Sequence, residues 1–388
     1  MANNKKSPFV LIKQSMGKIG KSEITLLLAS TIISLLLVET GARVWLHNFA
    51  TPKQFHIYSL ISEIDPQSRI YSPHHYLNYY PTPNFKKGLT YHNALGYRDK
   101  EFTVKKPPGE YRIVTLGGST TYTTSVADNE KTYPSQLEKT LKKTYGYDNV
   151  RVINAGVGGY NSWESLINLQ FRVLDLDPDL VIVYHGGNDI TQRMVLPEAY
   201  RGDNSGSRRQ WSLPPVSFLD YSCFLRIIRR KMGLSYQTDL NLVTRANSNF
   251  IYRTYFISPQ IESSLAGLLK INPPIYFKRN LQNMVVIAKE HGAKIMLATF
   301  AHTHAYTTYT KHYFSSGTYR QIGYAESNKV VKDIAINYSI PLFDFANAMP
   351  KYVRYWSDAV HLNESGALLK AELFAQFINE QGLITKER

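Results

Sequence analysis

From about residue 111 to the C-terminus, short apolar runs rich in β-branched residues alternate with longer amphipathic stretches. Runs of this kind are typical of buried strands, and the apolar spacing in the longer stretches is typical of helices. The alternation predicts a parallel sheet with helices on both faces. Strands are expected at residues 112–116, 150–154, 180–184, 294–299 and 340–343. Helices are expected near residues 133–145, 162–174, 275–291, 319–338 and 363–381.

Glycine-rich turns with polar residues follow the first three predicted strands. Ser119 comes after the first strand, Gly159 lies in the turn after the second, and Asn188 follows the third. The carboxyl ends of parallel strands meet at one edge of a sheet, where open α/β folds place their ligands. We therefore expect these residues to lie close together. Taken singly, each has a plain alternative, since a serine or glycine can simply close a turn and an asparagine can cap a helix.

Near the C-terminus, Asp358 precedes His361 by three residues. A serine hydroxyl becomes a useful nucleophile when a base takes its proton, and histidine suits that task at neutral pH. A carboxylate beside the histidine would fix its tautomer and stabilise the imidazolium. Alone, His361 could equally be a hydrogen-bonded surface histidine and Asp358 a helix N-terminal residue. Four such stretches in order at predicted strand ends favour catalysis.

Together the four stretches resemble the sequence blocks of the SGNH (GDSL-type) hydrolases, named for Ser, Gly, Asn and His. The resemblance runs from about Asn93 to the last helix, and it implies a flavodoxin-like three-layer α/β/α sandwich with about five parallel strands. It implies a triad of Ser119, His361 and Asp358. It also implies an oxyanion hole made by the backbone N–H groups of Ser119 and Gly159 and the amide of Asn188. Gly118 stands where the motif's name has aspartate, as in similar bacterial members with Gly-Gly-Ser-Thr-Thr.

Further residues are candidates for lining the pocket: Gly118, His185, His302 and His304. His302 and His304 form a His-x-His after the fourth predicted strand, with His312 beyond. On a strand, such a pair can bind zinc from one face. No further ligand cluster is evident, and the resemblance implies neither a metal nor a cofactor. Pocket lining or ordinary hydrogen bonding is the preferred interpretation.

The N-terminal part of the chain resembles a signal anchor. Residues 1–23 are basic, residues 24–38 carry no charge, and the apolar segment reaches bilayer length at about residue 46. A cleaved signal peptide would need a small-x-small site, and no convincing one follows Val38. A buried core helix would not explain the preceding lysines. We expect a single transmembrane helix at 24–46, a cytoplasmic N-terminus and an extracytoplasmic catalytic domain.

The remaining organisation follows from composition. Residues 47–110 are rich in aromatic residues and proline and are expected to pack on the main domain, with an Asn-x-x-Gly-aromatic-Arg element at 93–98. The hydrolase domain would span 111–388, with an insertion at about 190–274 where the alternation stops. That insertion could cap the site, pack to one side, or lie on the membrane. Its membrane contacts would come from four basic residues: Arg226, Arg229, Arg230 and Lys231.

The formal net charge of +15 favours anionic surroundings such as lipid headgroups or acidic polymers. Nucleic acid is the rival partner, but the basic residues are scattered and no nucleic-acid-binding motif is present. The single cysteine, Cys223, excludes an intramolecular disulfide and a cysteine-based metal site.

The leading functional hypothesis is a membrane-anchored serine esterase that removes acetyl groups from an extracytoplasmic glycan. An O-acyltransferase acting on a surface polysaccharide is close behind, because a sugar hydroxyl can intercept the same acyl-enzyme. A lipid esterase or lysophospholipase is third, and a non-catalytic glycan-binding relative is another alternative. A flavodoxin-like module whose residues 117–124 cradle a phosphate is a different class, and the Asp358–His361 pair argues against it.

Overall fold

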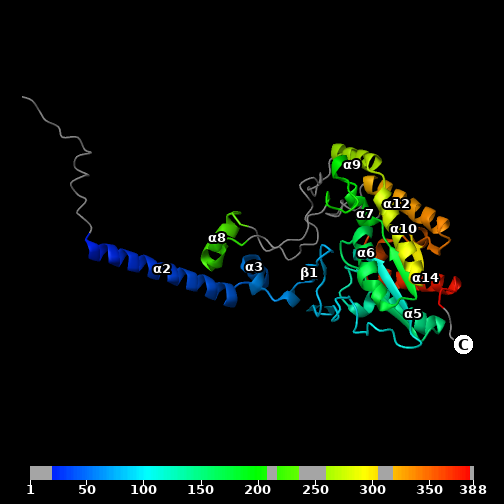
Figure 1. Ribbon diagram of the computed structural model, residues 1–388, viewed down its shortest axis with the longest axis horizontal. Coiled ribbons are helices and arrows are strands. Elements are labelled where there is room, and N and C mark those ends of the chain that lie inside the picture. The colour runs from blue at the N-terminus through cyan, green and yellow to red at the C-terminus, as the bar shows by residue number, and fades with distance from the viewer. Residues whose placement is uncertain (1–19, 208–215, 236–258, 305–317, 385–388) are drawn as a thin grey trace, which may run out of the picture. The chain divides into compact units, whose positions relative to one another are not determined.

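The computed structural model describes residues 20–207, 216–235, 259–304 and 318–384. These residues form two compact units (Figure 1), and each is described by itself. The helical unit contains residues 20–64 and 216–235, and the sheet unit contains the other described residues. Two features singled out in the sequence lie outside the described residues: the first 19 residues of the basic stretch, and His312.

The helical unit is built on one long helix, α2, which spans Lys21–Asn48. Among the described residues, α2 is the one helix long and apolar enough to cross a membrane. An N-terminal signal sequence would fit the same length and composition. The other elements of the unit are short: α3 at Pro52–Tyr58, η1 at Ile61–Glu63, η7 at Phe218–Tyr221 and α8 at Cys223–Lys231.

The sheet unit contains a five-stranded sheet in the order β6-β5-β7-β8-β9, and every neighbouring pair is parallel. The strands are β5 at Tyr111–Gly117, β6 at Val150–Asn154, β7 at Leu180–Tyr184, β8 at Lys294–Ala298 and β9 at Leu342–Phe343. All five lie where the sequence predicts them, and this order is that of flavodoxin-like folds. The predicted fold class is therefore confirmed.

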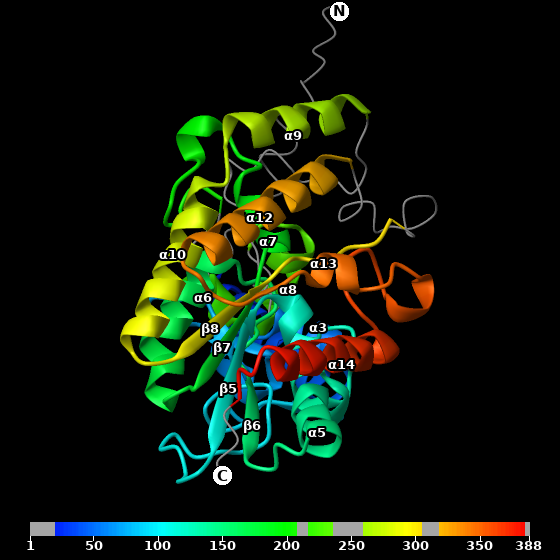
Figure 2. The same ribbon diagram turned by 90° about the vertical axis from the view of Figure 1, so that its right-hand side faces the viewer.

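Alternate strand residues bury against opposite helical layers. On β7, Ile182 joins the apolar cluster formed with α5 and α14, whereas Val181 and Val183 join the cluster formed with α10 and α12. Figure 2 shows α5 and α14 on one side of the strands and α6 and α10 on the other. Burial on both faces explains why these strands are almost continuously apolar.

Helices connect the strands, and four of the five predicted helices begin and end within a residue or two of their predicted positions. The helices of the sheet unit are α4 at Ser119–Tyr122, α5 at Tyr133–Tyr145, α6 at Ser162–Asn168, α7 at Gly187–Gln192, α9 at Pro259–Ile271, α10 at Ile275–Glu290, α12 at Thr318–Asn337, α13 at Phe345–Ala348 and α14 at Glu364–Glu380. The helix expected at 162–174 is interrupted, because α6 passes into a π-helical turn at Leu169–Val173.

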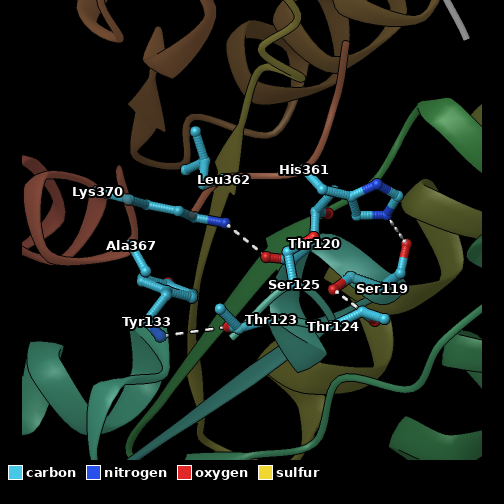
Figure 3. Close-up of a pocket in the computed structure, with 10 residues that line it drawn as sticks. All are labelled: Ser119, Thr120, Thr123, Thr124, Ser125, Tyr133, His361, Leu362, Ala367 and Lys370. Carbon is cyan, nitrogen blue, oxygen red and sulfur yellow. Dashed lines mark hydrogen bonds between the residues drawn. The ribbon is translucent and has the colours of Figure 1, made fainter. Parts of the chain in front are cut away.

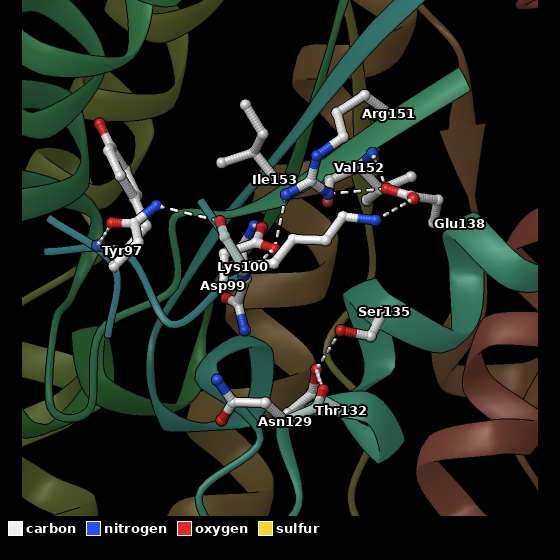
Figure 4. Close-up of polar contacts among 12 residues, drawn as sticks. Tyr97, Asp99, Lys100, Asn129, Thr132, Ser135, Glu138, Arg151, Val152 and Ile153 are labelled. Atoms are coloured by element: carbon white, nitrogen blue, oxygen red, sulfur yellow. Dashed lines mark hydrogen bonds and ion pairs between the residues drawn. The ribbon is translucent and has the colours of Figure 1, made fainter. Parts of the chain in front are cut away.

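Residues 65–106 wrap the sheet unit with two small antiparallel pairs and irregular chain. Their strands are β1 at Tyr71–Ser72, β2 at Tyr80–Pro81, β3 at Lys86–Lys87 and β4 at Thr90–Tyr91. A buried ionic network attaches this segment to the sheet (Figure 4). In it, Arg151 of β6 donates to Asp99 and to Glu138 of α5, over 2.6 and 2.7 Å. Burial alone would raise the pKa of Glu138, but Arg151, the Val152 N–H and Lys100 lower it to about 2.

The structure divides two segments that the sequence treats as single pieces. Of the preamble expected at 47–110, residues 47–64 belong to the helical unit and residues 65–110 to the sheet unit. Of the insertion expected at 190–274, α9 belongs to the sheet unit, where Leu265 and Leu269 are buried in its core. The stretch that includes α8 belongs to the helical unit.

Candidate active site

Ser119, Gly159 and Asn188 all follow strands at the carboxyl edge of the sheet. Strand β5 ends at Gly117, Gly118 precedes the short helix α4, and Ser119 is the first residue of that helix. Gly159 lies in the turn between β6 and α6, and Asn188 lies in the first turn of α7 after β7. Because β5 pairs with both β6 and β7, the three turns are neighbours.

His361 and Asp358 reach the same edge from the loop before α14. The Oγ atom of Ser119 lies 2.7 Å from Nε2 of His361 (Figure 3). On the other side of the ring, Nδ1 lies 2.7 Å from Oδ2 of Asp358. A hydroxyl, an imidazole and a carboxylate joined in this order form the arrangement that transfers a proton from a serine during nucleophilic attack.

The carboxylate of Asp358 is held in its charged form. Burial by itself would raise its pKa, but hydrogen bonds and the charge of His361 outweigh burial and lower the pKa below its ordinary value. Its second oxygen, Oδ1, accepts from the backbone N–H groups of Val360 and His361, each over 2.8 Å. These bonds also fix the carboxylate against the imidazole, an arrangement that favours a proton on Nδ1 of His361 and leaves Nε2 facing Ser119.

The side-chain amide of Asn188 lies against the backbone that precedes the serine. Its Nδ2 donates to the carbonyl oxygen of Tyr160 over 2.7 Å, which fixes the orientation of the amide. A Cβ atom at Gly118 would lie 2.7 Å from this Nδ2 and 2.9 Å from the Tyr160 oxygen. The glycine at position 118 is therefore required by close packing, and this explains the absence of the motif's aspartate.

The turn that contains Gly159 is braced by tyrosines. Gly159 adopts a left-handed conformation with φ at 82°, which glycine tolerates best. The hydroxyl of Tyr79, from the wrapping segment, donates to the carbonyl oxygen of Gly158 over 2.7 Å. The hydroxyl of Tyr160 donates to the carbonyl oxygen of Tyr79. Residues 65–106 therefore support the site as well as the sheet.

A family comparison is consistent with this geometry. The model of the GDSL-like lipase/acylhydrolase family matches residues 115–369, which include the serine, glycine, asparagine and aspartate–histidine stretches. The chain belongs to this family. It is therefore a serine ester hydrolase of the GDSL type, as the sequence blocks predict. A search of curated proteins found no match.

Solved structures of GDSL-type enzymes resemble the chain only distantly. The acetyl xylan esterase AlAXEase is 15% identical, with a TM-score of 0.40 over 68% of this chain and 98% of its own. A lipase/acylhydrolase from Enterococcus faecalis is 17% identical, with a TM-score of 0.41 over 72% and 99%. A GDSL-like lipase from Bacteroides thetaiotaomicron is 15% identical, with a TM-score of 0.37 over 71% and 91%. At this distance, the likenesses carry no argument about substrate.

In this GDSL-type hydrolase a small pocket opens beside the serine (Figure 3). It encloses about 210 Å³, part of it open to solvent. Hydroxyl-bearing side chains are frequent in its lining, and the buried Lys370 is also part of it. The lining residues are Ser119, Thr120, Thr123, Thr124, Ser125, Tyr133, His361, Leu362, Ala367 and Lys370.

Lys370 is a buried residue of the site that the sequence analysis does not identify. Its Nζ atom donates to the carbonyl oxygen of Thr120, next to the serine, over 3.3 Å. It also lies 4.1 Å from the ring centre of Tyr133 and 3.8 Å from that of Tyr184. Burial lowers its pKa well below the ordinary lysine value. A signal exists in the sequence, since Lys370 occupies the apolar face of α14 at helical spacing from Ala367 and Phe374.

Arg98 is a second residue whose role the sequence does not reveal. It is almost completely buried and supports the loop that follows the serine helix. Its guanidinium donates to five acceptors between residues 122 and 129: the carbonyl oxygens of Tyr122, Thr123, Val126 and Ala127 and the side chain of Asn129. The element at 93–98, expected to pack the preamble on the main domain, thus also fixes this loop.

The histidines suggested as pocket lining lie elsewhere. His185 is buried, its Nε2 lies 2.7 Å from the Ser165 hydroxyl, and burial lowers its pKa to about 3. The expectation that it faces the pocket mouth is therefore wrong. His302 stacks on Tyr324, 4.5 Å between ring centres, and burial lowers its pKa to about 4. His304 packs against His302, and neither lines the pocket beside the serine.

The segment that contains these two histidines nevertheless supports the site. The backbone N–H of Thr303 donates to the carbonyl oxygen of Ala359, over 2.8 Å, inside the Asp358–His361 loop. Within the described residues, no group of three or more His, Cys, Asp or Glu side chains could hold a metal ion. His302 packs on the ring of Tyr324, and His304 packs on His302.

Proposed function

We propose that the chain is a membrane-anchored serine esterase that removes acetyl groups from an extracytoplasmic glycan. The observation that carries the proposal is the continuous relay from Ser119 through His361 to Asp358, which stands at the mouth of a small pocket. The same residues carry both halves of an ester hydrolysis through a covalent acyl-enzyme.

In the first half, Oγ of Ser119 attacks the ester carbonyl while Nε2 of His361 takes the hydroxyl proton. The charge that forms on the imidazole is stabilised by Asp358. As the tetrahedral intermediate collapses, His361 returns the proton to the leaving sugar oxygen and the acyl group stays on the serine. In the second half a water molecule repeats the attack, His361 takes its proton, and acetate leaves as the proton returns to Ser119.

The negative charge of each tetrahedral intermediate needs hydrogen-bond donors. We assign this role to the backbone N–H groups of Ser119 and Gly159 and to the amide of Asn188. The amide is held beside Gly118 by its bond to the Tyr160 oxygen, so it needs no rearrangement when charge develops. Its Nδ2 carries a second hydrogen, which is available for the substrate.

The size and lining of the pocket support a short acyl group. The pocket is small, and part of its roughly 210 Å³ of empty space is open to solvent. Four threonine and serine residues besides Ser119 contribute to its wall, whereas a long acyl chain requires an extended apolar channel. The formal charge of +15 suits an acidic polymer as acceptor, with rates that fall as salt screens the charge.

Contacts inside the helical unit support a retained anchor over a cleaved signal peptide. The carboxylate of Glu39, near the end of the apolar run, accepts hydrogen bonds from the first turn of α8. Leu46 is buried, and Trp45 packs on Tyr58 with ring centres 6.2 Å apart. Cleavage after residue 46 would remove all three of these groups from the helical unit.

The proposal is tested with full-length protein and a panel of esters: p-nitrophenyl acetate, an acetylated sugar, p-nitrophenyl palmitate and a lysophospholipid. Ser119→Ala should abolish hydrolysis, whereas Ser125→Ala, which changes another hydroxyl of the same pocket, should keep most of it. Labelling by a fluorophosphonate should follow the same pattern, because it reports an activated serine.

The outcomes separate the competing functions. Near wild-type hydrolysis by a folded Ser119→Ala protein would refute the assigned nucleophile. Faster turnover of palmitoyl esters than of acetyl esters would favour a lipid esterase. Transfer of the acetyl group to an added sugar at the expense of free acetate would favour an O-acyltransferase. Absence of fluorophosphonate labelling would favour a non-catalytic glycan-binding protein.

A further inference from the structure

The helical unit holds η7 and α8 at the end of the apolar run of α2. The carboxylate of Glu39 accepts from the hydroxyl of Ser222 over 2.7 Å and from the N–H groups of Cys223 and Phe224 over 2.9 and 3.1 Å. It thereby caps the N-terminus of α8. Arg43, one turn further along α2, donates to the carbonyl oxygen of Tyr221 over 2.9 Å.

The arginines of α8 fix the helix from a second side. Arg226 and Arg230 are buried, with only 1% of Arg226 exposed. Arg226 forms a two-pronged ion pair with Glu63. The remaining acceptors of the two guanidiniums are the backbone oxygens of Ile57, Tyr58, Ser59 and Asp220. These two basic side chains thus face protein, which corrects the expectation that they would contact the membrane.

With those arginines turned inward, the outward surface of the segment is largely apolar. Phe218 is 80% exposed and Tyr221 is 64% exposed. Leu225, Ile228 and Met232 follow at helical spacing and share one face of α8. The exposed large apolar side chains between residues 216 and 235 are Val216, Phe218, Leu219, Tyr221, Leu225, Met232 and Leu234. A concentration of this kind indicates a binding surface.

The position of this surface along α2 identifies what covers it. A bilayer core about 30 Å thick takes roughly 20 helical residues, so a span that begins at Ile24 ends near residue 43. Glu39 and Arg43, which hold η7 and the first turn of α8, stand at that boundary. Exposed aromatic and aliphatic side chains beside cations such as Lys231 are the composition of elements that lie at a lipid–water interface.

We propose that η7 and α8 form an interfacial segment that lies in the headgroup region of the bilayer, with Phe218 and Leu225 reaching the acyl-chain boundary. The inference rests on the proposed anchor and adds a second site of lipid contact. The occupant is a phospholipid surface on the side of the membrane where α2 emerges. The contacts of the segment with lipid are apolar, since Arg226 forms an ion pair with Glu63 and Arg229 one with Asp220, both within the helical unit.

The test places a fluorophore at single cysteines of the full-length protein in phosphatidylcholine–phosphatidylglycerol vesicles. In a Cys223→Ser background, an environment-sensitive nitrobenzoxadiazole is attached to Phe218→Cys or Leu225→Cys. Leu35→Cys in the apolar run of α2 is the membrane reference. Val286→Cys, on the exposed face of α10, is the aqueous control. Each labelled protein must hydrolyse p-nitrophenyl acetate at the wild-type rate, which shows that its sheet unit is folded.

Lipids brominated on the acyl chain should reduce emission from positions 35, 218 and 225 and leave position 286 unchanged. Quenching at 35 without quenching at 218 and 225 would overturn the inference and leave the anchor standing. Loss of quenching at positions 35, 218 and 225 would contradict both the proposed anchor and the proposed interfacial segment, while hydrolysis would still report on the active site. A label at 218 that is shielded from iodide but not quenched by bromolipid would show that protein covers the surface, which also contradicts the inference.

Discussion

At Gly118 a single side chain would alter the proposed oxyanion hole. A Cβ at this position would press on Nδ2 of Asn188 and on the oxygen of Tyr160. We expect Gly118→Asp, which restores the residue in the motif's name, to lower kcat by about 10²–10³, as loss of one oxyanion donor does. KM for p-nitrophenyl acetate should change little. Gly267→Ala is the matched control, because a Cβ there meets nothing within 4 Å. Full activity of the Gly118→Asp protein would contradict the proposed role of Asn188 as an oxyanion donor.

Lys370 should make stability depend on pH. Burial lowers its pKa well below 10.5, so between the lowered pKa and 10.5 the residue is neutral when folded and protonated when unfolded. The unfolded chain then binds the extra proton, and stability rises with pH through that window, by at most about 1.4 kcal/mol per pH unit. Lys370→Met lacks this dependence. Its free energy of unfolding, measured in urea relative to wild type, should therefore be most favourable at low pH and fall as pH rises.

If the difference in free energy of unfolding between wild type and Lys370→Met stays constant from about pH 6 to about pH 10, Lys370 has the same charge in the folded and unfolded chain. Lys329→Met serves as the control, because Lys329 is an exposed lysine with an exposed partner, Asp333. Its effect on the free energy of unfolding should not vary over this range.

The site residues differ in how far the sequence could predict them. Ser119, Asn188, Asp358 and His361 stand in short motifs at strand ends, so local sequence was sufficient to bring them together, while their catalytic roles stay predictions. Lys370 has no motif, because its partners come from separate parts of the chain. They are the carbonyl of Thr120 and rings on α5, β7, α13 and α14.

At the scale of elements, one side chain fixes the loop after the serine helix. Arg98 supplies donors to five acceptors there, and lysine has only one nitrogen to replace them. We expect Arg98→Lys to lower the free energy of unfolding by about 1–3 kcal/mol, since buried carbonyls lose their donors. It should also lower kcat for p-nitrophenyl acetate, because Ser119 begins the helix that this loop continues.

Arg279→Lys is the matched control for this prediction. Arg279 lies on α10 and donates to Gly202 and Asn280, away from the loop that follows Ser119. Its replacement should leave kcat near the wild-type value. If Arg98→Lys loses stability but keeps kcat, the loop is held by Arg98 without any effect on the serine.

The sheet was predictable because burial on both faces leaves a continuous apolar run at each strand. The helix at 162–174 was predicted as one piece, since its apolar spacing continues through the π-helical turn at Leu169–Val173. The insertion was the least predictable element. Its composition allowed α8 to cap the site, pack to one side, or use its arginines on a membrane. Only the contacts of the side chains themselves, Arg226 with Glu63 and Arg230 with the backbone oxygen of Ser59, show that these arginines are used internally.

At the scale of the whole molecule, residues 20–64 and 216–235 belong to the helical unit, whereas residues 65–207 and the described residues from 259 onward belong to the sheet unit. The helical unit is therefore assembled from segments distant in sequence, and α2 supplies its central element. A segment that is removed during export would not normally provide the cap of another helix. This dependence is the physical argument that α2 stays attached.

We accordingly expect the mature protein to retain α2, with its N-terminus in the cytoplasm and residue 388 outside. A chain tagged at both ends should stay whole, remain in the membrane after alkaline carbonate extraction, and carry p-nitrophenyl acetate hydrolysis with it. Protease added to intact spheroplasts should digest the C-terminal tag and spare the N-terminal one. Glu39→Leu lengthens the apolar run and removes the cap of α8, so it should keep the chain in the membrane while making α8 easier to cut. A soluble, active protein without its N-terminal tag would show instead that the segment is a cleaved signal sequence.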